Sequence, residues 1–303
     1  MRVATGDDAG VGSSGARLPG GLPVAPGGRP GGGLRDDGTV SEQQHDLVGV
    51  IGGSGFYSFF ADATEHLVDT PYGPPSGPVT VGEVAGRTVA FLPRHGRHHE
   101  HPPHQVPYRA NLWALRSLGV RQVIAPCAVG GLRPELGPGT VVVPDQLVDR
   151  TSSGRAQTFF DTGGVHVEFA DPYCPDLRAA ALQPGTVDGG TMVVVEGPRF
   201  STRAESRWFA AQGWSLVNMT GHPEAVLARE LEMCYAAVAL VTDLDAGVEA
   251  GAGVRAVDVF AEFGRNVEKL KDLVRAAVGA APTVRDCVCV HVHDGLALPI
   301  TLP

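Results

Sequence analysis

The sequence predicts an α/β fold, a single domain with a central mixed β-sheet flanked by helices. Two observations point to this fold class. Short apolar runs, which suit buried strands, alternate along the chain with segments of helical periodicity, and such alternation is typical of a largely parallel or mixed sheet covered by helices. The chain is long enough for a large core, because it has 303 residues of which 43% are hydrophobic, and it contains no internal repeat.

Seven short apolar runs are expected to form buried strands, at residues 48–51, 89–92, 120–127, 140–143, 191–195, 216–218 and 236–242. A helix is expected over residues 108–118, where Gly119 closes it. A second helix follows Thr202 and runs to about residue 212, because Thr202 and Glu205 have the spacing of a capping box.

Two more helices are expected in the second half of the chain. Pro223 suits the first turn of one of them, which ends before Tyr235. The other is amphipathic, since apolar residues recur at steps of three and four at Phe260, Phe263, Val267, Leu270 and Val274.

The two ends of the chain differ from the folded domain, which is expected over residues 46–280. Residues 1–45 are rich in Gly and cannot bury enough apolar surface to offset the entropy lost on ordering, so we expect a disordered extension. Residues 281–303 form a tail with a possible edge strand at a subunit contact. On such a strand, every second residue from 287 to 293 would lie on one face, and these residues are Cys287, Cys289, His291 and His293. Thiolate and imidazole ligands suit zinc, but four neighbours on one straight strand cannot surround a tetrahedral ion. A metal site is therefore the less favoured interpretation.

Composition excludes several classes of protein. A net charge of −9 argues against broad nucleic-acid binding, which needs a basic surface. The five cysteines are odd in number and scattered, unlike a secreted disulfide framework. The sequence has no apolar run of about 18 residues that would span a membrane and no apolar signal-peptide core. We therefore expect a cytoplasmic protein whose partners include neither nucleic acid nor membrane.

Two polar segments that follow predicted strands suit an anion. In residues 52–55 the glycines expose backbone N–H groups, and Ser54 adds a hydroxyl donor, although an ordinary turn is an equal alternative. Arg94 and His95 begin the histidine-rich segment 94–99 at another strand end, where the sites of α/β proteins usually lie. The planar guanidinium suits phosphate oxygens. A solvated loop is the alternative here, and a metal site is disfavoured because the spacing matches no zinc pattern.

Two further segments at strand ends contain candidate functional residues. Thr220 precedes a helix start, where free N–H groups and the helix dipole favour anions, although a helix cap is as consistent with the sequence. Asp243 and Asp245 are two residues apart, so both side chains of an extended chain face one side. Adjacent carboxylates disfavour double ionisation, which lets one of them stay protonated and act as an acid. Two solvated loop acids are the alternative.

Together these segments resemble the methylthioadenosine phosphorylases, within the trimeric purine nucleoside phosphorylase superfamily. The resemblance extends from about residue 47 to residue 271. It rests on residues 49–55, 94–99, 107–115, 145–151, 196–206, 218–220 and 242–245.

The resemblance implies a nucleoside phosphorylase-like fold and two adjoining sites. The phosphate site would be formed by Ser54, Arg94, His95, Cys127, Ala128 and Thr220. The nucleoside site would be formed by Ser201, Met219, Asp243, Asp245 and Ala256. It further implies a homotrimer whose active sites are completed across the subunit contact.

The resemblance also implies a reaction, the phosphorolysis of 5'-methylthioadenosine to adenine and 5-methylthioribose 1-phosphate. Protonated Asp243 would donate toward N7 of the purine as the general acid, and Asp245 would accept from the 6-amino group. Inorganic phosphate is the co-substrate, and no metal or organic cofactor is needed. Cys127 stands where the family usually has a hydroxyl residue, and a thiol is a weaker donor.

The nearest alternative is a broad-specificity or 6-oxopurine nucleoside phosphorylase, acting on inosine or guanosine, or a methylthioinosine phosphorylase. Carboxylates accept hydrogen bonds from an amine but face a keto oxygen poorly, so the aspartate pair favours 6-aminopurines. His222, if near the 5' group, would instead favour a 5'-hydroxyl. A non-catalytic nucleotide-binding protein is disfavoured by the intact set of Arg94, Thr220 and Asp243. A dinucleotide oxidoreductase is disfavoured by the glycine spacing.

Overall fold

A computed structural model describes residues 47–303 apart from positions 54, 57, 58, 61, 153, 250 and 252, so the predicted extension at residues 1–45 lies outside it. The described residues form an eleven-stranded sheet and six α-helices. The strands are β1 Val48–Gly52, β2 Ala63–His66, β3 Val79–Val84, β4 Arg87–Pro93, β5 Gln122–Gly131, β6 Val141–Val143, β7 Gln146–Arg150, β8 Thr186–Asp188, β9 Thr191–Val195, β10 Leu216–Asn218 and β11 Cys234–Leu244. The helices are α1 Tyr108–Ser117, α2 Pro175–Ala181, α3 Arg203–Ala211, α4 Gly221–Glu230, α5 Ala256–Ala280 and α6 Val288–His291.

Four parallel strands form the centre of the sheet. β1 lies between β4 and β5, and β11 runs parallel to β5 from Cys234 to Leu244. The carboxyl ends of parallel strands meet at one edge of a sheet, which is where ligands bind in open α/β folds. The carboxyl ends of β1, β4, β5 and β11 therefore lie along one edge of the sheet.

The far end of β5 joins a second group of strands. Gly130 and Gly131 pair with β10, which runs antiparallel to β5 and parallel to β9. The pairing of β11 with β5 shifts register between Val241 and Asp243, so that Thr242 forms a bulge. Bulges bend a strand and redirect its side chains, and this one lies immediately before the first aspartate of the predicted acid pair.

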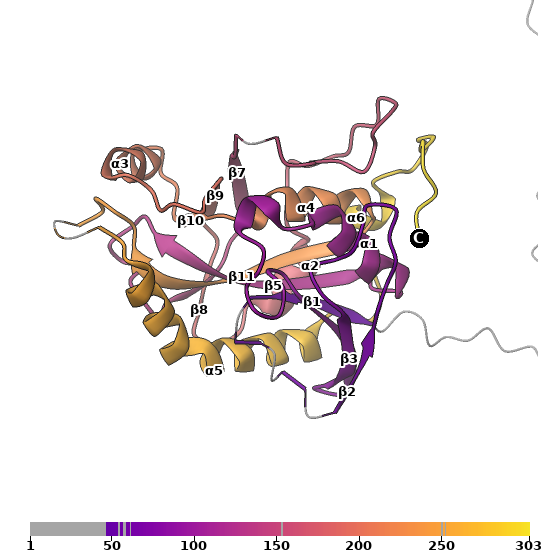
Figure 1. Cartoon of the computed structure of the whole chain (residues 1–303), viewed down its shortest axis with the longest axis horizontal. Coiled ribbons are helices and arrows are strands. Elements are labelled where there is room, and N and C mark those ends of the chain that lie inside the picture. Colours follow the sequence, from indigo (N-terminus) through magenta and orange to yellow (C-terminus); the bar gives the residue numbers. More distant parts are fainter. Residues whose placement is uncertain are drawn as a thin grey trace, which may run out of the picture. The chain divides into compact units, whose positions relative to one another are not determined.

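Helices cover both faces of the central strands (Figure 1). Side chains alternate across β5, so Val123 packs with α1 and α4 on one face while Ile124 packs with α5 and α2 on the other. A smaller cluster under α3 contains Phe209 and Val217. No helix in the described residues is both long and apolar enough to cross a membrane.

The structure confirms the seven predicted strands and the four predicted helices, with shifts of a few residues at their ends. The capping box is present, since the Thr202 side chain accepts from the Glu205 N–H and the Glu205 carboxylate accepts from the Thr202 N–H. Six elements were not predicted from the sequence, namely β2, β3, β7, β8, α2 and α6. The first three residues of β2 are exposed, which explains why hydrophobic patterning did not reveal that strand.

The predicted edge strand in the tail is wrong. Residues 288–291 form the short helix α6, with Cys287 as its N-cap. A short run of alternating residues does not by itself distinguish a strand from a helical turn. Here the burial of Cys287 and Cys289 in the cluster beneath α2 and α5 decides the conformation.

Candidate active site

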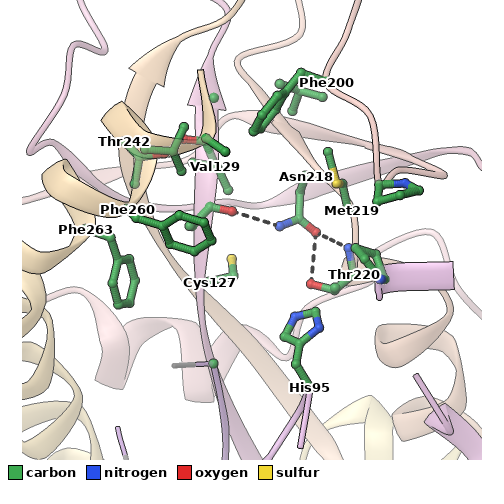
Figure 2. A pocket seen from close by; sticks show the side chains of 18 of the residues that line it. His95, Cys127, Val129, Phe200, Asn218, Met219, Thr220, Thr242, Phe260 and Phe263 are labelled. Atoms are coloured by element: carbon green, nitrogen blue, oxygen red, sulfur yellow. Dashed lines mark hydrogen bonds between the residues drawn. The ribbon is translucent and has the colours of Figure 1, made fainter. Parts of the chain in front are cut away.

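One cavity of about 470 Å³ opens at the carboxyl edge of the central strands. Every residue predicted for the phosphate or the nucleoside site that the structure describes lines it: Arg94, His95, Cys127, Ala128, Ser201, Met219, Thr220, Asp243, Asp245 and Ala256. Ser54 lies outside the described residues, and its neighbour Gly53 lines the cavity. In Figure 2, His95 lies at one end of the cavity, while Met219 and Thr220 face Phe260 and Phe263 across it.

The two aspartates lie together at the end of β11, as their spacing predicts. Asp243 accepts a hydrogen bond from Thr242 Oγ1 at 2.8 Å, and buried Asp245 accepts one from Ser206 Oγ at 2.5 Å. Burial raises the pKa of Asp243 to about 6; the Thr242 hydrogen bond lowers it, and the charge of Asp245 raises it further. Asp243 is thus partly protonated near neutral pH, as a general acid must be.

Gly130 allows this close approach of the acid pair to β5. A Cβ atom at Gly130 would lie 3.3 Å from both Asp243 Oδ1 and Asp245 Cβ, and 2.9 Å from Val217 Cγ1. A larger residue there would clash first with the Val217 side chain and would also crowd the acid pair. This glycine was not predicted as a site residue, because its role depends on a strand that is distant in sequence.

Arg94 is not the open phosphate fork that the sequence suggested. Its side chain is 2% exposed, and it donates to Glu224 through Nε and Nη2, both at 2.8 Å. Nη2 also donates to the Ile51 carbonyl and Nη1 to the Pro126 carbonyl. These contacts use four of the five N–H groups of a guanidinium and leave one, on Nη1. Arg94 therefore provides a fixed positive charge and a single donor at the cavity wall.

His95 is held in one orientation by its neighbours. Its Nδ1 lies 2.8 Å from the carbonyl oxygen of His101, so the proton is assigned to Nδ1, and its ring stacks on that of His99 at 4.6 Å. Burial, followed by the charge of Arg94, lowers the pKa of His95 to about 4. The ring is consequently neutral at pH 7, which leaves Nε2 as an acceptor for a hydroxyl of phosphate or of the sugar.

The turn before α4 is organised by Asn218 (Figure 2). Its Oδ1 accepts from the N–H groups of Thr220 and Gly221, both at 2.7 Å, and its Nδ2 donates to the Ala128 carbonyl at 3.2 Å. Two N–H groups that were expected to bind an anion are therefore already bonded. The Thr220 hydroxyl donates a long hydrogen bond of 3.4 Å to Asn218 Oδ1, which is the weakest of these bonds and the one that an anion could most easily replace.

Cys127 takes a central position in the cavity wall (Figure 2). Burial raises the pKa of its thiol to about 12; the charge of Arg94 lowers it, and that of Glu224 raises it. The thiol is neutral at physiological pH. It can donate a weak hydrogen bond, but it is not a nucleophile, since nucleophilic cysteines react as thiolates.

An apolar wall completes the cavity, and of its members only Met219 was predicted as a site residue. Its members are Phe200, Met219, Val259, Phe260 and Phe263. The periodicity of α5 predicted an amphipathic helix from positions that include two of these phenylalanines, yet Phe260 is 60% exposed and only the later apolar positions of the helix are buried. His222 does not line the cavity; its Nε2 lies 3.3 Å from Asp149 Oδ2.

Arg155 supports the Met219 side of the cavity from behind. It is buried, and its Nη1 donates to the carbonyl oxygens of Met219 and His222 at 2.8 Å. Its Nε and Nη2 donate to the side chain and the backbone carbonyl of Glu196. No local sequence signal marks Arg155, because its partners lie 41 to 67 residues away.

The predicted ligand set in the tail is only partly brought together. His291 is exposed and contacts Asp286 and Asp294, while His293 Nε2 lies 2.8 Å from the Glu230 carbonyl. Neither imidazole faces Cys287 and Cys289, which converge on other cysteines instead. The histidine-rich segment after β4 does not form a metal-binding cluster among the described residues.

Comparison with known proteins agrees with this geometry. The model of the phosphorylase superfamily matches residues 47–279. The S-methyl-5'-thioadenosine phosphorylase of Mycolicibacterium smegmatis is 71% identical over 259 residues, which cover 85% of this chain and 100% of that protein. A purine nucleoside phosphorylase of Streptomyces coelicolor is 61% identical over 273 residues, covering 84% and 97% of the two chains.

A solved structure shows the same fold. Methylthioadenosine phosphorylase from Schistosoma mansoni in complex with adenine superposes with a TM-score of 0.73 at 36% sequence identity, covering 77% of this chain and 91% of that one. The chain therefore belongs to the phosphorylase superfamily, in the family of the S-methyl-5'-thioadenosine phosphorylases.

Proposed function

We propose that this chain catalyses the phosphorolysis of 5'-methylthioadenosine to adenine and 5-methylthioribose 1-phosphate. The observation that carries the proposal is the acid pair of Asp243 and Asp245 in a cavity that also contains anion-binding groups. A nucleoside phosphorylase needs both features, one to bind the departing base and one to hold the attacking phosphate. The high identity to S-methyl-5'-thioadenosine phosphorylases supports the same reaction.

At the base end, Asp243 acts as the general acid. An oxygen of phosphate forms a bond to C1' of the ribose while the C1'–N9 bond breaks, and the bonding electrons pass to the purine. Protonated Asp243 donates its proton to N7 and leaves adenine neutral. Asp245, oriented by Ser206, accepts a hydrogen bond from the 6-amino group. Solvent then reprotonates Asp243.

At the phosphate end, three groups of different character bind the anion. Arg94 supplies a fixed charge and one N–H, Thr220 a hydroxyl, and neutral His95 an acceptor for a P–OH group. With Cys127 and Ala128 as flanking contacts, these residues hold phosphate against C1'. Inorganic phosphate is the co-substrate, and the reaction uses no metal or organic cofactor.

The apolar wall suits a 5'-methylthio group better than a 5'-hydroxyl. Met219, Phe260 and Phe263 offer no polar partner, and burying an unpaired hydroxyl costs about 1–3 kcal/mol. The imidazole that would favour a hydroxyl, that of His222, does not line the cavity. This arrangement supports methylthioadenosine over adenosine.

A substrate panel tests the proposal. Methylthioadenosine, adenosine, methylthioinosine, inosine and guanosine are each incubated with the enzyme, with and without phosphate, and base release is measured. We expect phosphate-dependent release of adenine from methylthioadenosine at the highest kcat/KM. A preference for inosine or guanosine would overturn the assignment of base recognition to the aspartate pair. Cleavage that does not require phosphate would exclude a phosphorylase.

The proposal includes assembly into a homotrimer that completes each cavity across a subunit contact. It is supported by exposed apolar residues on the first turns of α5, where Val257 is 59% and Phe260 is 60% exposed, because large apolar side chains beside a cavity commonly mark an interface. Sedimentation at three times the mass of one chain is expected. A monomer with full activity would contradict this part of the proposal.

A further inference from the structure

Four of the five cysteines converge at a place that the proposed reaction does not use. The Sγ atoms of Cys174, Cys234, Cys287 and Cys289 all lie within 4.8 Å of one another, and all four residues are buried. The fifth, Cys127, is in the active-site wall. Cys174 is the N-cap of α2, Cys234 begins β11, and the other two belong to the N-terminus of α6.

The spacing of the sulfurs suits a tetrahedral metal centre. Zinc binds thiolates at about 2.3 Å, which places neighbouring sulfurs of a tetrahedral site roughly 3.8 Å apart. The Cys234 and Cys287 sulfurs are 3.4 Å apart, and the remaining separations stay below 4.8 Å, so small side-chain rotations reach the required geometry. Four thiolate ligands with no oxygen donor select a borderline-soft ion such as Zn²⁺ over Mg²⁺ or Ca²⁺.

A positive charge beside the cluster would stabilise thiolates. Arg285 is partly buried and holds its Nε 3.4 Å from Cys234 Sγ, while its Nη2 donates to the Glu232 carbonyl, which fixes the guanidinium beside the cluster. A zinc ion with four thiolates has a net charge of −2, which Arg285 partly offsets.

The position in the fold indicates a structural role. Cys234 and Asp243 lie nine residues apart on β11, so the cluster is about 30 Å from the acid pair. The four cysteines come from three segments, and successive segments are more than 50 residues apart. Two of the cysteines, Cys287 and Cys289, lie in the tail after α5. An ion there would fasten the tail to β11 and α2, as zinc does in small structural sites with four protein ligands.

We propose that Cys174, Cys234, Cys287 and Cys289 bind one Zn²⁺ ion in a closed tetrahedral site that fixes the C-terminal tail to the sheet. On binding, the four thiols release four protons and become thiolates, and no group is oxidised or reduced. Two of these ligands were considered from the sequence alone; the other two are found only in the fold.

Metal analysis of the full-length enzyme, expressed with zinc and purified without chelator, tests the proposal. We expect one zinc per chain in the wild type and loss of that zinc in C287S and in C174S. C127A is the matched control, because it removes the one cysteine outside the cluster, and it is expected to keep its zinc. H291A and H293A should also keep zinc, which separates the four-cysteine site from the set suggested by the tail sequence.

Two further measurements keep the test decisive if the serine variants fail to fold. Cobalt exchanged into the wild-type protein should give the intense visible bands and the thiolate charge-transfer absorption of a tetrahedral sulfur site. Titration of thiols in denaturant and chelator should find five per chain. Fewer thiols, with no zinc, would show that the cluster forms disulfides. Five thiols with no zinc would show four packed free cysteines. Either result overturns the proposal.

Discussion

The proton on Asp243 links catalysis to stability at a single residue. Its folded pKa of about 6 exceeds the ordinary value of 3.8. Between these two values the folded state retains a proton that the unfolded chain has lost, so the free energy of unfolding decreases as pH rises through this window. Above pH 6 the full free-energy cost of burying the ionised Asp243 carboxylate is present. The enzyme thus keeps a destabilised carboxyl group where an acid is needed.

The variant D243N should separate the effect of Asp243 on catalysis from its effect on the free energy of unfolding. We expect kcat to fall about 10²–10⁴-fold, because an amide cannot transfer a proton to N7. We also expect the variant to be more stable than the wild type at pH 8, by about 1–2 kcal/mol, with the difference vanishing below pH 4. Urea unfolding at both pH values measures this. D272N, at an exposed aspartate on α5 that pairs with Arg275, is the control. Equal stability of D243N and wild type at pH 8 would show that the Asp243 pKa is not raised.

Asp245 should determine which base is accepted. Ser206 already donates to one of its oxygens, which leaves the other free to accept from a 6-amino group. In D245N the amide oxygen can take the bond from Ser206, and its NH₂ group then faces the base as a donor. We expect the ratio of kcat/KM for methylthioadenosine over methylthioinosine to fall about 10–100-fold. An unchanged ratio in a folded variant would remove Asp245 from base recognition.

At the scale of elements, the Arg94–Glu224 pair joins the end of β4 to α4. Both side chains are almost fully buried, and Glu224 also accepts from the Tyr235 hydroxyl at 2.7 Å. E224Q leaves the Arg94 charge without its counter-ion, so the free energy of unfolding should drop by about 3–5 kcal/mol. E65Q breaks the exposed pair with Arg97 and should cost no more than about 1 kcal/mol. Similar losses in the two variants would contradict the structural role of the buried pair.

The elements that the sequence predicted are those that carry a local signal, such as continuous burial, apolar periodicity or a capping pattern. β11 was recognised because its first nine residues are all buried, and α3 because its capping box is a local pattern. β2 is mostly exposed, and α6 was mistaken for a strand because the position of its cysteines depends on Cys174 and Cys234. Hydrophobic periodicity is a local signal, so it cannot predict an element whose conformation depends on contacts with distant segments.

The same distinction applies to the cavity. Asp243 and Arg94 were found because they follow apolar strands, whose carboxyl ends meet. The supporting roles of other residues were not predicted, since Glu224 and Arg155 bond to residues far away in the sequence and Asn218 bonds to backbone groups of its own turn. Arg94 has fewer open donors than the sequence suggested for the same reason: residue type indicates which hydrogen bonds can form, and only the fold shows which are already made.

At the scale of the whole molecule, the two ends of the chain should contribute unequally. The cavity is lined by residues between Gly53 and Phe263, and the family match begins at residue 47. Removal of residues 2–45 should therefore leave kcat/KM for methylthioadenosine and the Tm within error of the full-length values. Steady-state kinetics and thermal unfolding measure this. A large loss of activity would place a part of the extension in the working site.

Removal of residues 283–303 should instead destabilise the domain. This tail buries Cys289 and His293, and His293 Nε2 contacts the Glu230 carbonyl at the end of α4. Arg285 also bonds to the Glu232 carbonyl, next to the start of β11. Truncation exposes this part of the core and leaves buried carbonyl groups without partners, so the Tm should fall by several degrees although every residue lining the cavity is retained. An unchanged Tm would show that the tail contacts add nothing to stability. Loss of activity at a temperature where the truncated protein is still folded would show that the tail acts on the catalytic end of β11 as well as on its start.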